Sequence, residues 1–452
     1  MSLHSPRKPL RPQFNVTIPS LALNCPRLTI TAAFVAWAVL KLALALYTPG
    51  PAYDTSTAIH LARLHSAYND PAFGQESLLW RLCERLTRWD AIYFTQAANH
   101  GYRNEQEWAF GWGYVQVIVY LQSGLEMITQ HSFGPLSRIL LAVVVSNASH
   151  FLSAIALYHL SAIVFSDRAT PSRRVLPLVA ALLHIISPAG LFLSAPYSES
   201  LFSLLTTTGY WLYTKSTKSS AGIGQSFLLL MSAVSLSISC TVRSNGLLHG
   251  IPFLIDFILE LGQFVRRPGF LAVFRITTLG ICGLMIAGGL VLPQFIAWRQ
   301  FCLGSSKAEW CGNTIPSVYF WVQDKYWNVG FLRYWTVSNI PLFALAAPTL
   351  AVLLKTGVWG LRAASTGATD TALLWKLSIP QILLAGMAIT SYHVQIITRL
   401  SSGCVVWYWY VAKAIVEKEK HRNAKEGRVI VRWMVLYGLI QGALFSSFLP
   451  PA

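Results

Sequence analysis

The most polar stretch of the chain, residues 81–112, contains an acid that could act as a catalytic base. In this stretch Asp90 directly follows Arg88 and Trp89. A carboxylate beside a membrane could accept the proton of a sugar hydroxyl while that oxygen attacks an activated carbon. The positive charge of Arg88 would favour the ionised form of Asp90. The alternative is a surface aspartate that only pairs with Arg88.

Three further acids are candidates for the same site. Glu105 and Glu107 follow Asp90 in the polar stretch, and Asp54 precedes it. Glu105 and Glu107 could orient sugar hydroxyls, or they could be solvated surface residues. We predict that Asp90 is the catalytic residue. The predicted substrate contacts in this stretch are Arg88, Trp89, Glu105 and Glu107.

A second group of polar residues interrupts apolar runs later in the chain. The segment SAPYSES (194–200) contains a proline, which prevents a continuous helix, and Glu199. A glutamate at the end of an apolar span is costly unless it faces a polar cavity, and a short capped turn is the alternative. The segment RSNG (243–246) contains Arg243 and Asn245. Arg243 could bind an anion or extend towards lipid headgroups. We predict that Glu199, Arg243 and Asn245 contact substrate.

A third group lies near residue 395. His393, Gln395 and Arg399 follow one another within seven residues. An arginine suits a phosphate because its planar fork donates two parallel hydrogen bonds. We predict that His393 and Arg399 contact substrate. The aromatic run WYWY (407–410) could form a membrane-interface belt or a sugar platform.

The composition is that of a helical membrane protein. Of the 452 residues, 54% are hydrophobic and 12% are charged, whereas about 25% are charged in soluble domains. Backbone groups in lipid must be bonded within their own segment, so apolar runs become helices. The net charge of +17 could suggest nucleic acid, but the basic residues lie between apolar runs, where membrane orientation explains them. We find no zinc-binding spacing or phosphate-binding glycine loop, and we predict no metal or cofactor.

The apolar runs predict about eleven membrane spans in one all-α domain, 28–452. The spans are expected at 28–47, 138–165, 175–193, 198–213, 225–242, 246–262, 271–297, 336–355, 373–393, 401–416 and 429–449. Residues 1–27 are basic and rich in proline, and they predict a disordered cytoplasmic tail. Two long polar loops, 48–137 and 298–335, separate the spans.

The positions of Lys and Arg orient these spans. With a cytoplasmic N-terminus, the short basic connections share the cytoplasmic side. These connections are 166–174, 214–224, 262–270, 356–372 and 417–428. Both long loops then lie on the opposite, lumenal side. In the first loop, Ala58–Tyr68 and Val115–Met127 are amphipathic and predict helices that lie on the membrane. Counting Val115–Met127 as a span would break the charge pattern.

Two of the seven cysteines, Cys302 and Cys311, share the second long loop. That loop is predicted to lie in an oxidising compartment, where disulfides form and persist. We therefore predict a disulfide between them, with two free thiols as the alternative.

Several ordered blocks of this chain resemble the GPI mannosyltransferase 2 family. The first-loop signature of that family is similar to RWDAIYFTQAANHGYRNEQEWAF (88–110). Further blocks resemble SAPYSES (194–200), RSNG (243–246), PSVYFWVQDKYWNVGFLRYW (316–335), HVQIITRLSSG (393–403) and WYWYVA (407–412). The resemblance runs from about residue 28 to the C-terminus.

This resemblance implies a glycosyltransferase of the C superfamily (GT-C) in the endoplasmic reticulum membrane, with a lumenal active site. It implies dolichyl-phosphate mannose as donor and a GPI precursor that carries one mannose as acceptor. The new bond would be α-1,6, formed by an inverting displacement. Asp90 matches the essential acid that the family places in its first lumenal loop. The partners implied are these two lipids and the membrane, with room for a small accessory membrane subunit.

Two other classes of protein stay open from the sequence. A transporter or flippase for a charged lipid would also need polar groups among its spans. It would place them at the bilayer midplane, however, whereas those of this chain cluster at one face. The other class is a noncatalytic subunit of a glycolipid-synthesis complex, which would tolerate the loss of Asp90.

Overall fold

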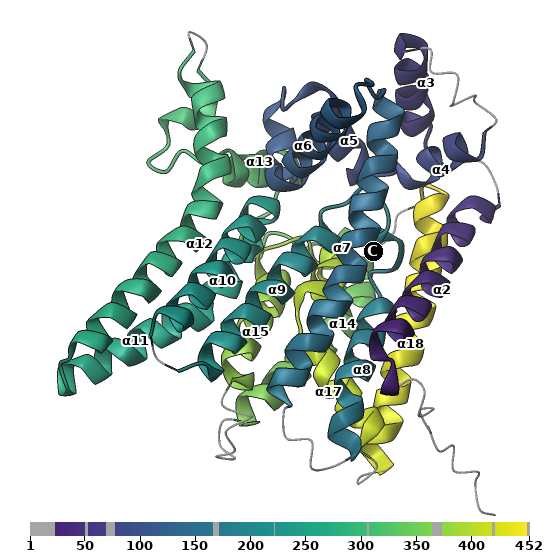
Figure 1. Cartoon of the computed structure of the whole chain (residues 1–452). Coiled ribbons are helices and arrows are strands. Elements are labelled where there is room, and N and C mark those ends of the chain that lie inside the picture. Colours follow the sequence, from purple (N-terminus) through teal and green to yellow (C-terminus); the bar gives the residue numbers. More distant parts are fainter. Residues whose placement is uncertain are drawn as a thin grey trace, which may run out of the picture.

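The computed structural model shows an all-helical bundle among the residues that it describes, 23–49, 53–68, 77–165, 171–220, 222–304, 307–363, 373–417 and 421–449. Long helices lie side by side along the bundle, and short helices gather at one end (Figure 1). The first 22 residues of the predicted tail lie outside the described part, as do 166–170, 364–372 and 418–420 of the basic connections. Helix α2 begins at Pro26, two residues before the predicted span.

Each predicted span corresponds to a helix. These helices are α2 (Pro26–Tyr47), α7 (Pro135–Val164), α8 (Pro171–Ile185), α9 (Glu199–Lys218), α10 (Ile223–Val242), α11 (Ile251–Arg266), α12 (Phe270–Cys302), α14 (Ile340–Ala363), α15 (Leu374–Thr390), α17 (Val406–Val416) and α18 (His421–Ser446). Seven segments of the described chain are long and apolar enough to cross a membrane, and two shorter apolar helices lie in α8 and α15. The chain is therefore a multi-pass membrane protein. The number of eleven spans stays a prediction.

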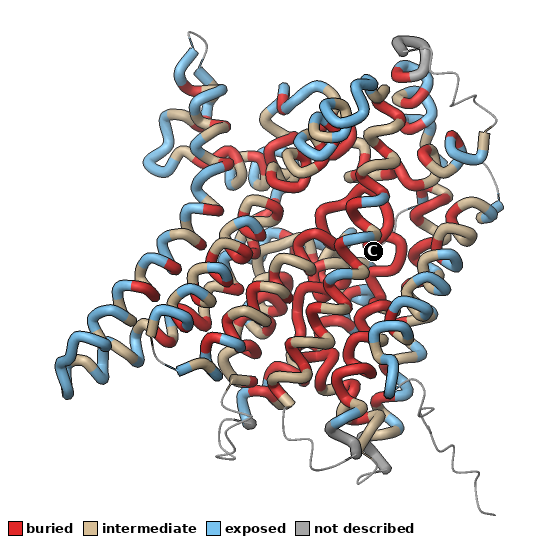
Figure 2. Tube along the Cα trace, viewed as in Figure 1, coloured by how far each residue is buried: buried red, intermediate tan, exposed pale blue. Residues whose placement is uncertain are grey.

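Helices α9 and α17 fall outside those apolar segments: α17 has only 11 residues, and other helices surround both. Helix α9 packs against α7 and α10, and α17 packs against α8, α14 and α18. Polar side chains bond α9 to its neighbours: Ser232 Oγ of α10 donates to Gly209 O of α9 at 2.6 Å, and Ser203 Oγ of α9 donates to Ser402 O, just before α17, at 2.8 Å. A helix enclosed by protein does not need a lipid-facing apolar surface. Buried residues are concentrated there, and exposed residues follow α11 and α12 (Figure 2).

Three predicted spans are interrupted at the end of the bundle where the short helices gather. The span predicted at 175–193 ends at Ile185 and continues as the 3-10 turn η3 (Gly190–Leu193). The span predicted from 246 begins as the 3-10 turn η4 (Ser244–Gly250). The span predicted from 401 begins at Val406, after three short turns. These are η9 (Val394–Ile396), α16 (Ile397–Leu400) and η10 (Ser401–Gly403). Irregular backbone at such depth is tolerated where protein or a cavity encloses it.

The first long loop folds into short helices, as its amphipathic segments predict. They are α3 (Ser56–Tyr68), α4 (Leu78–Leu86), α5 (Asp90–His100), the 3-10 turn η2 (Glu105–Ala109) and α6 (Trp112–Thr129). Helix α6 is not among the segments that could span a membrane. The second long loop contributes the 3-10 turn η5 (Glu309–Gly312) and helix α13 (Val318–Trp327). Both loops lie at the same end of the bundle, which we call the loop face (Figure 1).

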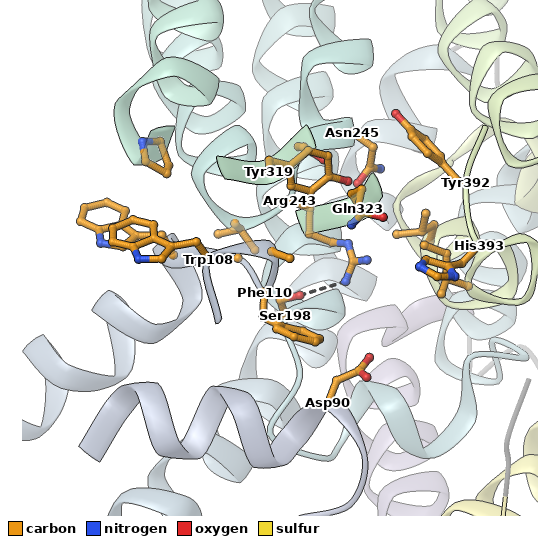
Figure 3. A pocket seen from close by; sticks show the side chains of 18 of the residues that line it. Asp90, Trp108, Phe110, Ser198, Arg243, Asn245, Tyr319, Gln323, Tyr392 and His393 are labelled. Carbon is orange, nitrogen blue, oxygen red and sulfur yellow. Dashed lines mark hydrogen bonds between the residues drawn. The ribbon is translucent and has the colours of Figure 1, made fainter. Parts of the chain in front are cut away.

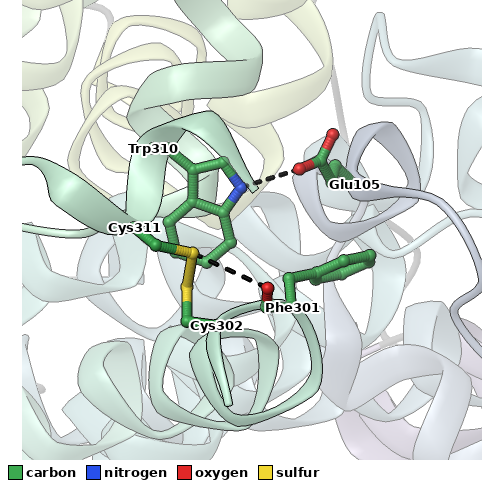
Figure 4. The surroundings of a disulfide bond; sticks show 5 residues. All are labelled: Glu105, Phe301, Cys302, Trp310 and Cys311. Carbon is green, nitrogen blue, oxygen red and sulfur yellow. Dashed lines mark hydrogen bonds between the residues drawn. A yellow bond between two sulfur atoms is a disulfide. The ribbon is translucent and has the colours of Figure 1, made fainter. Parts of the chain in front are cut away.

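A disulfide and a hydrogen bond hold the two long loops together. The predicted disulfide between Cys302 and Cys311 is confirmed, and it closes the second loop onto the end of α12. Trp310, beside this disulfide, is completely buried, and its indole Nε1 donates to Glu105 Oε1 of the first loop at 2.9 Å (Figure 4). This hydrogen bond of Glu105 thus holds the first and second loops together at the loop face.

The predicted orientation can be tested with added cysteines in a Cys25→Ser background, in which the remaining free cysteines are buried. Lys325→Cys places a thiol on α13 at the loop face, and Lys215→Cys places one near the opposite end of α9; both positions are exposed. In sealed microsomes, a membrane-impermeant maleimide should label position 215 at once. It should label position 325 only after permeabilisation. Immediate labelling of both would contradict the orientation.

Candidate active site

A cavity of about 420 Å³ opens at the loop face. It lies between the first loop, the end of α10, residues 290–294 of α12, helix α13 and the turns after α15. Its polar and charged lining includes Asp90, Ser198, Arg243, Asn245, Gln294, Tyr319, Gln323, Tyr334, Tyr392, His393, Gln395 and Arg399. Figure 3 shows Asp90 on one side, Tyr319 and Gln323 on the other, and Arg243 between them. Five of the ten predicted site residues line this cavity: Asp90, Arg243, Asn245, His393 and Arg399.

Asp90 begins α5 and faces the cavity. Its side chain is 34% exposed, and its Oδ2 accepts a hydrogen bond from Arg399 Nη1 at 2.8 Å. The residue before it, Trp89, has a φ of 53°, in a region that non-glycine residues rarely occupy. This sharp turn starts α5 directly after the end of α4 and directs the carboxylate towards the cavity. Strained backbone of this kind is found at functional sites more often than elsewhere.

Arg399, from α16, lies between two carboxylates and two aromatic rings. Its Nε is 3.7 Å from Glu199 Oε1, and its side chain is only 11% exposed. The guanidinium carbon is 4.8 Å from the ring centre of Phe192 and 5.6 Å from that of Tyr197. Planar guanidinium groups suit such stacked and ion-paired positions. Arg399 therefore has a fixed geometry and holds Asp90 in place.

Glu199 lies behind the cavity surface and binds both arginines. It is 1% exposed, and its Oε1 also accepts from Arg243 Nη1 at 2.9 Å. Arg243 donates to Ser198 Oγ as well, at 3.0 Å. Ion pairs link four side chains in the order Asp90, Arg399, Glu199 and Arg243. Their two negative and two positive formal charges cancel. We call these residues the ionic quartet.

The two arginines of the ionic quartet differ in the exposure of their side chains. Arg243 caps the C-terminus of α10, and its side chain is 19% exposed. Asn245, two residues on, lines the same wall from η4. Arg399 is held by Asp90 and Glu199, whereas Arg243 has one carboxylate partner. Arg243 is therefore the more accessible cation.

The predicted partnership of Arg88 with Asp90 is wrong. Arg88 is completely buried; its Nη2 is 3.3 Å from Glu84 Oε1, and its guanidinium carbon is 5.1 Å from the ring centre of Phe448. Glu84 lies four residues earlier, so the turn after α4 directs Arg88 back onto that helix. Trp89 also packs on Phe448. Neither Arg88 nor Trp89 lines the cavity.

Glu105 and Glu107 do not line the cavity either. Glu105 bonds Trp310 between the two loops. Glu107 caps its own turn, where its Oε2 accepts from the backbone nitrogens of Arg103 at 2.6 Å and Asn104 at 3.0 Å. Both carboxylates thus have structural partners in place of the predicted role in orienting substrate. The fourth acid, Asp54, accepts from Ser56 and lies outside the lining too.

His393 lines the cavity and is packed by aromatic rings. Its ring centre lies 5.7 Å from that of Trp327 and 5.1 Å from that of Tyr334. Burial lowers the pKa of His393 to about 4; the charge on Asp90 opposes this shift, and that on Arg399 adds to it. This environment favours the neutral form of His393, in which one ring nitrogen donates a hydrogen bond and the other accepts one. Among the described residues, no group of three or more His, Cys, Asp or Glu side chains could hold a metal.

The candidate residues from the sequence omitted one wall of the cavity. Tyr319, Gln323 and Trp327 of α13 line it together. They lie four residues apart, the spacing that places side chains on one face of a helix. This periodicity within PSVYFWVQDKYWNVGFLRYW was the signal that could have identified them.

Comparison with known proteins gives a family for nearly the whole chain. The family model described as "Mannosyltransferase (PIG-V)" matches residues 27–363 and 370–452. GPI mannosyltransferase 2 of Aspergillus fumigatus is 41% identical over 473 residues, covering 100% of this chain and 95% of the relative. That of Chaetomium globosum is 40% identical over 467 residues, covering 94% and 96%. That of Saccharomyces cerevisiae is 27% identical over 453 residues, covering 94% and 99%.

Among solved structures, the crystal structure of the oligosaccharyltransferase of Archaeoglobus fulgidus superposes on this chain with a TM-score of 0.48 and 11% identity. The match covers 95% of this chain and 56% of that chain.

The ionic quartet predicts a large effect of Glu199→Gln on stability. Removing the buried carboxylate of Glu199 leaves Arg243 and Arg399 with one acid between them, which costs about 3–5 kcal/mol. The thermal unfolding midpoint of the detergent-solubilised protein should fall clearly. Glu309→Gln, at an exposed ion pair with Lys325, is the matched control and should change little. Adding Arg243→Gln to Glu199→Gln should recover part of the loss. Equal midpoints for Glu199→Gln and the parent protein would contradict the quartet.

Proposed function

The chain belongs to the mannosyltransferase (PIG-V) family, and from that premise we propose that it adds the second mannose of the GPI anchor precursor. The donor is dolichyl-phosphate mannose, and the acceptor is a GPI precursor that carries one mannose. The new bond is α-1,6, and the reaction occurs at the lumenal face of the endoplasmic reticulum membrane. Mannosyl transfer follows from the family. The donor, the linkage and the location are proposals.

The partly exposed carboxylate of Asp90, which faces the cavity, is the observation that carries this proposal. Among the described residues that line the cavity, Asp90 is the only acid. Arg399 occupies its Oδ2, and no hydrogen bond from the described residues reaches its Oδ1. One oxygen is therefore fixed, while the other can accept a proton. A general base needs this combination of fixed position and free lone pair.

Asp90 then activates the acceptor. Its carboxylate takes the proton of the primary 6-hydroxyl on the first mannose as that oxygen attacks C1 of the donor mannose. The new C1–oxygen bond forms on the face opposite the phosphate, and the C1–oxygen bond to phosphate breaks. The β-linked donor thus gives an α-linked product in one displacement. Dolichyl phosphate leaves with the bonding electron pair, and Asp90 holds the proton.

Arg243 supports the departure of the phosphate. Negative charge develops on the leaving oxygen, and a fixed cation nearby stabilises it. Arg243 is the more open arginine of the quartet, and Asn245 lies on the same wall of the cavity. Leu290 and Pro293 of α12 supply an apolar part of the lining, which suits the lipid portion of the donor. Arg399 acts on Asp90 and is a positioning residue in this scheme.

Asp90→Asn tests the catalytic role. The amide keeps the shape of the carboxylate and cannot take a proton, so transfer should fall by roughly a hundred- to ten-thousand-fold. Purified protein, labelled dolichyl-phosphate mannose and a singly mannosylated GPI acceptor give the measurement. Asp324→Asn, at an exposed pair with Arg333, is the control and should retain activity. Near-normal transfer by correctly folded Asp90→Asn would exclude Asp90 as the base.

Arg243→Gln tests the phosphate contact. Losing one charge-assisted hydrogen bond should raise the KM for the donor by roughly ten- to a hundredfold. The KM for the acceptor should stay within about twofold. Arg333→Gln, an exposed arginine of the second loop, should leave both constants unchanged. An equal rise in both constants would indicate a structural role for Arg243.

A further inference from the structure

Helix α13 forms a wall of the cavity that the proposed chemistry does not use. Tyr319, Gln323 and Trp327 face the cavity from this helix. Figure 3 shows Tyr319 and Gln323 across the cavity from Asp90. We call these three residues the α13 face. Its position opposite the base raises the question of what it binds.

The α13 face is held rigidly. Val318 and Val322 are completely buried beneath it. Gln294 of α12 fixes the first turn, because its Oε1 accepts from Ser317 Oγ at 2.8 Å and from Tyr319 N at 3.2 Å. The disulfide and the Trp310–Glu105 bond hold the preceding segment of the loop. The face is therefore formed before any ligand binds, which lowers the entropic cost of binding.

The polar atoms of the α13 face are available to a ligand. No described residue forms a hydrogen bond with the Tyr319 hydroxyl, the Gln323 side-chain amide or the Trp327 indole nitrogen. These atoms are also not buried without a partner. They therefore open onto the cavity with unused hydrogen-bonding capacity. Together they offer donors and acceptors beside two aromatic rings.

The α13 face is also uncharged. The charged residues of this helix lie elsewhere: Asp324 pairs with Arg333, and Lys325 pairs with Glu309, all at exposed positions. Aromatic rings with neutral hydroxyl and amide groups suit a ligand that has both apolar C–H faces and many hydroxyls. A hexose has this chemistry. A phosphate would select the arginine side of the cavity.

We propose that the α13 face is the subsite for the neutral sugar residues of the acceptor glycan. This inference rests on the proposed function, which supplies an acceptor with sugars beyond the reacting hydroxyl. The donor lipid would approach along the apolar wall of α12, whereas α13 belongs to the loop face, beside the upper part of α12 (Figure 1). An acceptor glycan between Asp90 and α13 would bring its reacting hydroxyl to the base.

Gln323→Ala and Tyr319→Phe test the subsite. Each removes hydrogen-bonding capacity from the α13 face, so the KM for the singly mannosylated GPI acceptor should rise by roughly three- to tenfold. The KM for dolichyl-phosphate mannose should remain within about twofold. Lys325→Ala changes the exposed side of the same helix and should alter neither constant. Unchanged thermal midpoints would show that each variant is folded.

The outcomes separate this inference from the proposed function. A rise only in the donor KM would assign the α13 face to the donor sugar and overturn the inference. Unchanged constants in both variants would exclude a sugar subsite there. In either case a parent enzyme that transfers mannose keeps the proposed function intact. A parent enzyme that transfers none to this acceptor would instead contradict the proposed function.

Discussion

The ion pairs of Arg399 with Asp90 and Glu199 are the interaction on which the site depends. The guanidinium is almost fully buried and needs both carboxylates and the flanking rings. It joins α5, α9 and α16, which lie far apart in the chain, and Glu199 extends the link to Arg243 at the end of α10. Loss of one member leaves an uncompensated charge in a poorly solvated place. The same pairing that stabilises the bundle therefore also fixes the direction of the proposed base.

The loop face adds a second constraint, because the cavity needs walls from both long loops. The first loop contributes Asp90, and the second contributes α13. The Cys302–Cys311 disulfide and the Trp310–Glu105 hydrogen bond set the distance between them. Residues of both loops and of the span ends line the cavity together. Closing the loops over it creates a place where water is limited and charges act more strongly.

The sequence predicted the parts of the site that are costly near lipid. Glu199, Arg243 and Arg399 stand at the ends of apolar runs, where only a polar cavity justifies them, and the structure brings them together with Asp90. It could not predict the direction of side chains within the first loop. Arg88 turns back to Glu84, and Glu107 closes a cap on Asn104 that the Asn-x-x-Glu spacing indicates. Hydropathy likewise placed the spans, but it did not predict the short turns that precede α11 and α17. There the surrounding protein permits irregular backbone.

The spacing of the quartet along the chain sets an order of events during synthesis. Glu199 and Arg243 are separated by 44 residues, so they can meet soon after both have left the ribosome. Asp90 must wait for Arg399, which is made 309 residues later. A nascent chain that stops before residue 399 can thus insert most of its helices while Asp90 still lacks its arginine partner. Quality control that recognises unpaired charge would find the unfinished chain at the carboxylate that we propose as the base.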